Sequence, residues 1–254
     1  MIDTVLFDVG GTLITQTHTP ERTISYARYI ITRLAEHGMK LPLSPEELVP
    51  YMRGRVESYK VWALENGHEL EPLRIWNEFV FGEFAFGEEK LSPIAEEFSF
   101  CYDYIRLDNR PREGLAFTLQ ALKDMGMKIG IITNTISGTF ADHILKENGV
   151  LDYFPVIVKS CESGYRKPDA RLFQLALDRI GSKKETTCYV GDTISRDVIG
   201  SRNAGLALCI KIDNPSISYR DAVYQKQGSP RADFEIQRLD EIPDLIGKLN
   251  RIGS

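Results

Sequence analysis

Residues 4–13 have the sequence TVLFDVGGTL, in which a short apolar run ends in an aspartate that is closely followed by two glycines. Residues 4–7 have the composition of a strand that is buried on both faces of a parallel sheet. Gly10 and Gly11 would let the backbone approach a ligand beside the Asp8 carboxylate. An ordinary turn after a strand has the same composition, so this stretch predicts the first strand and leaves the role of Asp8 open.

Further strands and helices alternate along the C-terminal part of the chain. Apolar runs at residues 128–133, 187–190 and 207–212 fit buried parallel strands. Residues 114–125 and 167–180 have the apolar spacing of amphipathic helices. Strands that alternate with helices in this way predict an α/β fold with a doubly wound, Rossmann-like parallel sheet.

Residues 15–109, called the helical insert below, interrupt that alternation. They contain no convincing strand, but helix starts are expected at Thr19-Pro20, at Ser44-Pro45 with its capping box to Glu47, and at Ser92-Pro93. We therefore predict two domains, a sheet domain of residues 1–14 and 110–254 and an inserted α-helical domain of residues 15–109. The aromatic residues of the insert have helical spacing and are expected to be mostly core: Tyr51, Tyr59, Trp62, Trp76, Phe79, Phe81, Phe84 and Tyr102.

Composition excludes several classes of protein. The 254-residue chain has a net charge of −5 and no basic stripe, which argues against an obligatory nucleic-acid partner. It has no basic leader and no run of about 20 apolar residues, so we expect neither export nor a membrane. Four scattered cysteines without a Cys-x-x-Cys pair indicate reduced, buried thiols and a cytoplasmic protein. Nothing in the sequence indicates the oligomeric state.

Polar side chains follow the predicted strands at their carboxyl ends, where open α/β sheets bind ligands. Asp192 and Asp197 lie on either side of a strand-to-helix turn, and two carboxylates with this spacing could converge on Mg²⁺. Thr133-Asn134 supplies a hydroxyl and exposed amides, although a plain turn or helix cap has the same composition. Lys167, which we expect at the mouth of a helix that begins near Pro168, would be a cation beside them.

The order of Asp8, Thr133, Lys167 and the Asp192/Asp197 pair resembles the four motifs of the haloacid dehalogenase superfamily. The resemblance covers the whole predicted sheet domain, and the helical insert is similar to the C1-type helical cap of that family. It implies that Asp8 is a nucleophile that forms an aspartyl-phosphate, and that Asp8, Asp192 and the carbonyl of Gly10 hold Mg²⁺.

The remaining motif residues receive supporting roles from the same resemblance. Asp197 would hold the metal ligands in place without itself binding the ion. Thr133 and the amide of Asn134 would bind phosphoryl oxygens, and Lys167 would offset the negative charge between Asp8 and the phosphate. The resemblance thus implies a hydrolase of small phosphorylated metabolites.

Gly10 is a departure from the family pattern. Phosphatases of this family have an aspartate two residues after the nucleophile, which acts as general acid and base, whereas this first motif is Asp-x-Gly-Gly-Thr. General acid–base catalysis contributes about 10²–10⁴-fold, so the enzyme is expected to be slow or to favour good leaving groups. His18 is a candidate for the missing group, although an ordinary linker histidine is the more common case.

Three alternatives stay open. The 2-haloacid dehalogenases also lack the second aspartate, but they lose the acidic metal motif that this sequence keeps. Phosphonoacetaldehyde hydrolases keep Mg²⁺ and use a cap lysine, for which Lys40 and Lys60 are the candidates. A catalytically silent protein that binds a phosphorylated ligand and has a regulatory role would retain the site without turnover.

Overall fold

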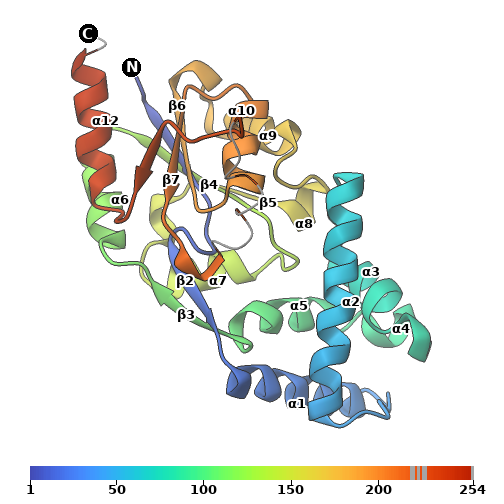
Figure 1. Cartoon of the computed structure of the whole chain (residues 1–254). Helices are drawn as coiled ribbons and strands as arrows, with labels where there is room; N and C mark the ends of the chain where they lie inside the picture. The colour runs from blue at the N-terminus through green and yellow to red at the C-terminus, as the bar shows by residue number, and fades with distance from the viewer. Residues whose placement is uncertain (218–220, 222–223, 225–227, 253–254) are drawn as a thin grey trace.

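The computed structural model describes residues 1–217, 221, 224 and 228–252 and contains a six-stranded parallel sheet (Figure 1). The strand order is β5-β4-β1-β6-β7-β8. The strands are β1 (Thr4–Phe7), β4 (Lys128–Thr133), β5 (Val156–Lys159), β6 (Thr187–Gly191), β7 (Leu208–Ile212) and β8 (Phe234–Ile236). The predicted doubly wound α/β fold is confirmed, and β1 lies in the middle of the sheet between β4 and β6.

Helices cover both faces of this sheet. The helices α6 (Leu115–Asp124), α7 (Phe140–Glu147) and α12 (Glu241–Ile252) share one apolar core with the strands. On the other face, α9 (Ala170–Ile180) buries Leu172 and Phe173 against Leu6 and Tyr189, and α10 (Ile199–Asn203) lies beside it. Successive strand residues alternate between the two cores, as the pleat of a strand buried on both faces requires.

The helical insert forms a separate apolar cluster beside the sheet (Figure 1). Its elements are α1 (Pro20–Glu36), α2 (Pro45–Asn66), α3 (Pro72–Arg74), η1 (Ile75–Val80), η2 (Gly82–Phe84), α4 (Glu88–Leu91) and α5 (Ala95–Tyr104). The capping box of Ser44 and Glu47 is present as predicted. All eight aromatic residues expected in the core pack in this cluster.

The structure corrects three expectations about elements. Two strands, β2 (Ile14–His18) and β3 (Leu107–Pro111), pair antiparallel where the insert leaves and rejoins the sheet. Their short, polar sequences have no apolar alternation, which explains why no strand was expected there. α5 begins at Ala95 rather than after Ser92, and α9 begins at Ala170 because Asp169 is its N-cap. The described residues also form short helical turns at α8 (Ser160–Ser163), η3 (Leu151–Tyr153), η4 (Lys184–Thr186), η5 (Ile194–Val198) and η6 (Pro215–Ile217).

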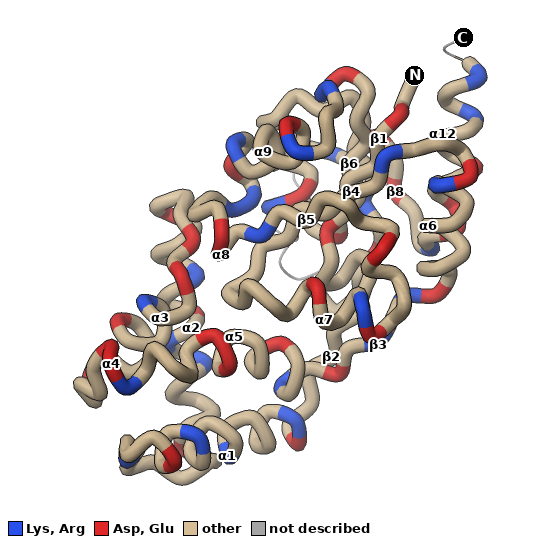
Figure 2. Tube along the Cα trace, turned by 180° about the vertical axis from the view of Figure 1, so that it is seen from behind, with Lys and Arg blue, Asp and Glu red and all other residues tan. Residues whose placement is uncertain are grey.

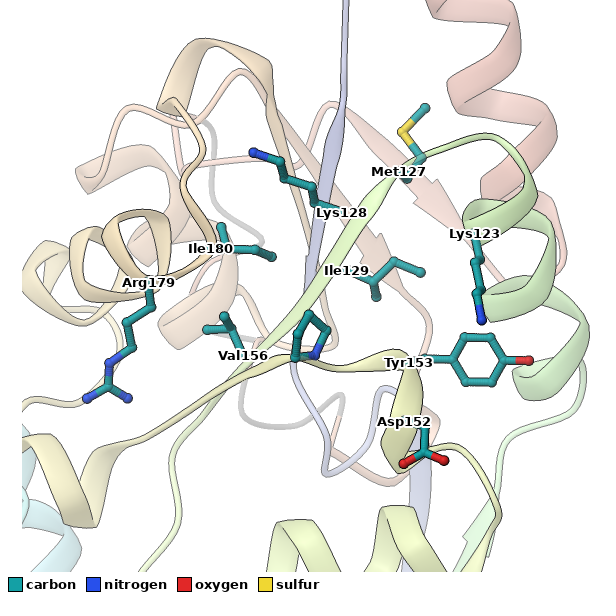
Figure 3. A pocket seen from close by; sticks show the side chains of 10 residues that line it. Lys123, Met127, Lys128, Ile129, Asp152, Tyr153, Val156, Arg179 and Ile180 are labelled. Carbon is teal, nitrogen blue, oxygen red and sulfur yellow. The ribbon is translucent and has the colours of Figure 1, made fainter.

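Charged residues of both signs are distributed over the described part of the chain. Lys and Arg alternate with Asp and Glu over the sheet and the insert (Figure 2). A hollow of about 490 Å³ beside the first residues of β4 and β5 is lined by Lys123, Lys128, Tyr153 and Arg179 among others (Figure 3). It lies at the amino ends of the strands, away from the predicted site. Within the described part of the chain, no helix is long and apolar enough to cross a membrane.

Candidate active site

Three predicted carboxylates meet at the carboxyl end of the sheet. Asp8 follows β1 and Asp192 follows β6, and these two strands are paired in parallel register. The short π-helical turn η5 after β6 brings Asp197 back toward them. One carboxylate oxygen from each of Asp8, Asp192 and Asp197 lies within 4.8 Å of the others, and all three residues are buried. The sequence therefore identified an acidic cluster that the fold assembles.

Lys167 joins this cluster through its ammonium group. Its Nζ lies 2.8 Å from Asp8 Oδ1 and 2.7 Å from Asp197 Oδ1, and it donates to the Tyr189 hydroxyl at 2.8 Å. Burial alone raises the pKa of Asp197, but Lys167 and then Arg196 outweigh burial and hold that pKa below its usual range. For Asp8, burial outweighs the attraction of Lys167 and raises the pKa. Lys167 lies just before the N-cap Asp169 of α9, as the sequence predicts, and its side chain is only 1% exposed.

Asn134 fixes the backbone from which Lys167 projects. Its side-chain Nδ2 donates to the Lys167 carbonyl at 3.0 Å, and its Oδ1 accepts from the Lys167 amide at 2.8 Å. These two bonds tie the end of β4 to the segment before α9. Thr133, the last residue of β4, is buried at the same sheet edge. The Asn134 side chain thus positions Lys167, while its predicted phosphate contact through the backbone amide stays a prediction.

Asp192 has one oxygen that no protein group satisfies. Its Oδ2 accepts from Asn214 Nδ2 at 2.7 Å, but within the described residues nothing donates a hydrogen bond to its buried Oδ1. Burial, followed by the charges of Asp197 and Asp8, raises the pKa of Asp192 to about 7. A buried carboxylate oxygen without a donor is costly unless a cation satisfies it. Together with the oxygen-only donor set, this atom fits a hard divalent cation.

Gly11 allows the first loop to pass close to Asp192. Its φ is +87°, and a β-carbon placed there would lie 1.9 Å from Asp192 Oδ2 and 2.6 Å from Asn214 Nδ2. Only glycine satisfies both the left-handed backbone and this contact. The second glycine of the first motif therefore has a steric explanation in the structure.

Arg196 supplies a second cation to the cluster. Its Nε donates to Thr193 Oγ1 at 3.3 Å, and its Nη2 lies 3.9 Å from Asp192 Oδ1. Three carboxylates with Lys167 and Arg196 leave one net negative charge. A divalent cation and a dianionic phosphoryl group have opposite charges of equal size, so binding both would leave the net charge of the site unchanged. The site can therefore accept the two together. No local sequence pattern indicates that Arg196, Tyr189 or Asn214 belongs to this cluster.

His18 is held near the start of the insert. Its Nε2 lies 2.8 Å from Thr23 Oγ1 in α1, and burial, with smaller effects of Arg106 and Arg53, lowers its pKa. The side chain that contacts Gly10 belongs instead to Gln16, whose Oε1 would lie 2.6 Å from a β-carbon placed on Gly10. His18 as the missing acid or base is therefore not supported by a contact at Gly10.

Glu96 and Glu69, two carboxylates of the helical insert, accept hydrogen bonds from loops of the sheet domain. Glu96 in α5 accepts from Ser137 Oγ at 2.6 Å and from Thr139 N at 3.1 Å, in the loop that follows β4. Glu69, which is 5% exposed, accepts from Ser160 Oγ at 2.8 Å and pairs with Arg166. The helical insert therefore contacts the segments that precede Lys167 and follow Thr133.

Comparison with known proteins agrees with this geometry. Residues 2–205 match the family model of haloacid dehalogenase-like hydrolases. A glyceraldehyde 3-phosphate phosphatase from Methanopyrus kandleri is 29% identical over 98% of this chain and 99% of its own. The pyrophosphatase PpaX from Halalkalibacterium halodurans is 31% identical over 97% of each chain. A crystal structure of a phosphatase of the same superfamily from Thermococcus onnurineus is 25% identical, with a TM-score of 0.60 over 97% of this chain and 98% of that one.

Proposed function

This chain belongs to the haloacid dehalogenase-like hydrolase family, and we propose that it hydrolyses small phosphorylated metabolites with Mg²⁺ through an aspartyl-phosphate on Asp8. The observation that supports this most directly is the buried cluster of Asp8, Asp192 and Asp197 around Lys167. Relatives named as glyceraldehyde 3-phosphate phosphatase and pyrophosphatase favour a small phosphate compound as substrate. We also propose that residues 15–109 act as a cap over this site.

The first half-reaction transfers the phosphoryl group to Asp8. One Asp8 carboxylate oxygen attacks phosphorus, and the bond to the leaving oxygen breaks with its electron pair on that oxygen. Lys167 stabilises the charge between Asp8 and the phosphoryl group, while Thr133 and the Asn134 amide bind its oxygens. Mg²⁺, held by Asp8, Asp192 and the Gly10 carbonyl, would neutralise phosphoryl oxygens when bound.

The second half-reaction is the slower one in this proposal. Gly10 has no side chain that can protonate a leaving group or activate a water. Good leaving groups such as acyl phosphates need little protonation, so they should phosphorylate Asp8 readily. Hydrolysis of the aspartyl-phosphate then limits turnover, and the phosphoenzyme should accumulate. A burst of product with acetyl phosphate, followed by slow turnover, is the kinetic signature of this mechanism.

The alternatives have less support. Metal-independent dehalogenation would not require the buried acidic cluster with its unsatisfied Asp192 oxygen. For a Schiff-base mechanism, Lys60 lies over the ring of Tyr102 in the insert and Lys40 is exposed. A catalytically silent ligand-binding protein would bind a phosphorylated ligand but show no turnover.

The test of the proposed function is phosphate release from p-nitrophenyl phosphate and acetyl phosphate with Mg²⁺ or EDTA, followed by a screen of phosphorylated metabolites. Equal turnover in EDTA after dialysis would refute the metal-dependent phosphatase.

We expect Asp192→Asn to raise the Mg²⁺ concentration needed for half-maximal activity by about 10–100-fold. The amide keeps the size of the side chain but removes the anionic oxygen that the protein leaves unsatisfied. Titration of phosphate release with Mg²⁺ measures the shift. Asp233→Asn is the matched control, because this carboxylate pairs with Arg202 on the surface outside the cluster. An unchanged Mg²⁺ requirement in Asp192→Asn would place the metal elsewhere.

The pKa of Asp192 predicts a pH-dependent metal affinity. Because its pKa is raised to about 7 without metal, a proton competes with Mg²⁺ for this carboxylate below that pH. The apparent Mg²⁺ affinity should fall by up to about tenfold per pH unit below about pH 7 and level off above it. Calorimetric Mg²⁺ titrations of the wild type at several pH values measure this. In Asp192→Asn the contribution of this group disappears, and an affinity that is flat in the wild type would contradict the prediction.

A further inference from the structure

Gln16, in β2, occupies the space where a side chain at position 10 would begin. A β-carbon on Gly10 would lie 2.6 Å from Gln16 Oε1 and 3.3 Å from its Cδ. A β-carbon on the neighbouring Gly11 would lie 1.9 Å from Asp192 Oδ2, so this loop borders the acidic cluster. The end of the Gln16 side chain therefore lies beside the loop that connects Asp8 to the insert, where the family motif has its acid and base.

The orientation of the Gln16 carboxamide is fixed by a neighbour. Gln16 pairs with Asn109 across β2 and β3, and its Nε2 donates to Asn109 Oδ1 at 3.0 Å. The Asn109 Nδ2 donates to the carbonyls of Asp103 and Leu107, at 2.8 and 3.2 Å. Since these carbonyls can only accept, the Asn109 oxygen must face Gln16, and the Gln16 oxygen must face Gly10. Within the described residues, no group donates to Gln16 Oε1.

We propose that Gln16 is a positioning residue whose Oε1 accepts a hydrogen bond from the water that hydrolyses the aspartyl-phosphate, in place of the carboxylate missing at Gly10. This proposal rests on the proposed function. A glutamine can orient an attacking water without acting as a base, as in Ras-type GTPases. A neutral carboxamide also adds no negative charge to a site that already has one in excess. Orientation alone can change a rate by up to about 10²-fold.

The step balances without a general base. The water oxygen attacks phosphorus, the bond between phosphorus and the Asp8 oxygen breaks, and the electron pair returns to the Asp8 carboxylate. A dianionic aspartyl-phosphate and water give the carboxylate and H₂PO₄⁻, so both protons of the water leave on the phosphate. Gln16 exchanges no proton. The dephosphorylation rate should therefore lack the rise with pH that a titrating carboxylate base would impose.

The test separates formation of phosphorylated Asp8 from its decay in quenched-flow experiments with acetyl phosphate and Mg²⁺, with intact mass as the readout. We expect Gln16→Ala to slow decay by about 10–100-fold while formation changes little. Gly10→Ala should also slow decay, because its methyl group displaces the Gln16 oxygen. Gln16→Glu should introduce a rise of the decay rate with pH that the wild type lacks. Thr17→Ala, an exposed neighbour on β2, is the control and should leave both rates unchanged.

Other outcomes overturn the proposal in distinguishable ways. Unchanged decay in Gln16→Ala shows that Gln16 does not orient the water, and the proposed function survives. If formation and decay fall together with a lower unfolding temperature, Gln16 only pairs the two strands with Asn109. If the wild type never forms phosphorylated Asp8, the proposed function fails and this proposal fails with it.

Discussion

Asp8→Asn should reduce turnover of acetyl phosphate and p-nitrophenyl phosphate by at least about 10⁴-fold, as loss of a covalent nucleophile does in other hydrolases. An amide oxygen is a poor nucleophile, and no phosphorylated side chain should appear by mass. The fold should tolerate the change, because the substitution removes a buried carboxylate whose pKa is already raised by its burial. Lys167 keeps Asp197 as its partner at 2.7 Å.

The measurements for Asp8→Asn are initial rates, intact mass after acetyl phosphate, and thermal unfolding. Asp3→Asn is a control for general effects of an amide at this end of β1, because Asp3 lies at the opposite, amino end of the strand. Turnover that persists in Asp8→Asn, with the wild-type metal requirement, would indicate direct attack by water and would refute the aspartyl-phosphate. A wild type that binds Mg²⁺ and phosphate but never turns over would instead support the silent ligand-binding protein.

The sheet and the acidic cluster were predictable because their signals are local. Buried parallel strands are continuous apolar runs, and the open α/β architecture places whatever follows them at one edge. Asp8 and Asp192 follow two such runs, so their meeting required only the correct strand order. Asp197 needed in addition the turn η5, which the spacing of the two aspartates suggested.

The rest of the site depends on contacts that leave no local pattern. Tyr189 lies inside an apolar strand, and nothing in its sequence context shows that its hydroxyl reaches Lys167 and Asp197. Gln16 and Asn109 are 93 positions apart and meet only because β2 and β3 pair. Asn214 follows β7 in a polar segment with no periodicity. In each case a polar atom forms a hydrogen bond that depends on how distant segments pack together. Composition and residue spacing give no indication of such contacts.

Lys167→Ala should be the variant in which activity and stability fall together. Lys167 is buried between Asp8 and Asp197, and removing one partner of a buried ion pair typically destabilises a protein by about 3–5 kcal/mol. Loss of one preorganised group that stabilises transition-state charge typically costs about 10²–10³-fold in kcat. Both losses are expected here, because one ammonium group serves two carboxylates.

The loss of stability in Lys167→Ala should depend on pH. Lys167 helps to hold the pKa of Asp197 below its usual range, so this carboxylate stabilises the fold above its unfolded-state pKa, and the contribution is lost as pH falls through the folded value. Without Lys167 that contribution is absent. The difference in unfolding free energy between wild type and Lys167→Ala should therefore be largest near neutral pH and shrink below about pH 4. Denaturant unfolding at several pH values measures it.

Lys159→Ala is the matched control, because it also removes a buried lysine at the carboxyl end of the sheet. Lys159 is 7% exposed and pairs with Asp142 and Glu162, whose side chains are 43% and 47% exposed. Water can solvate those carboxylates once the lysine is gone, so the loss of stability should be smaller and kcat/KM should change little. A Lys167→Ala variant that is destabilised yet retains full kcat/KM would make Lys167 a structural cation. A variant that loses activity without destabilisation would show that one of the carboxylates of Asp8 and Asp197 becomes protonated when the ammonium group is absent. The pH dependence of the unfolding free energy would then reveal this proton uptake.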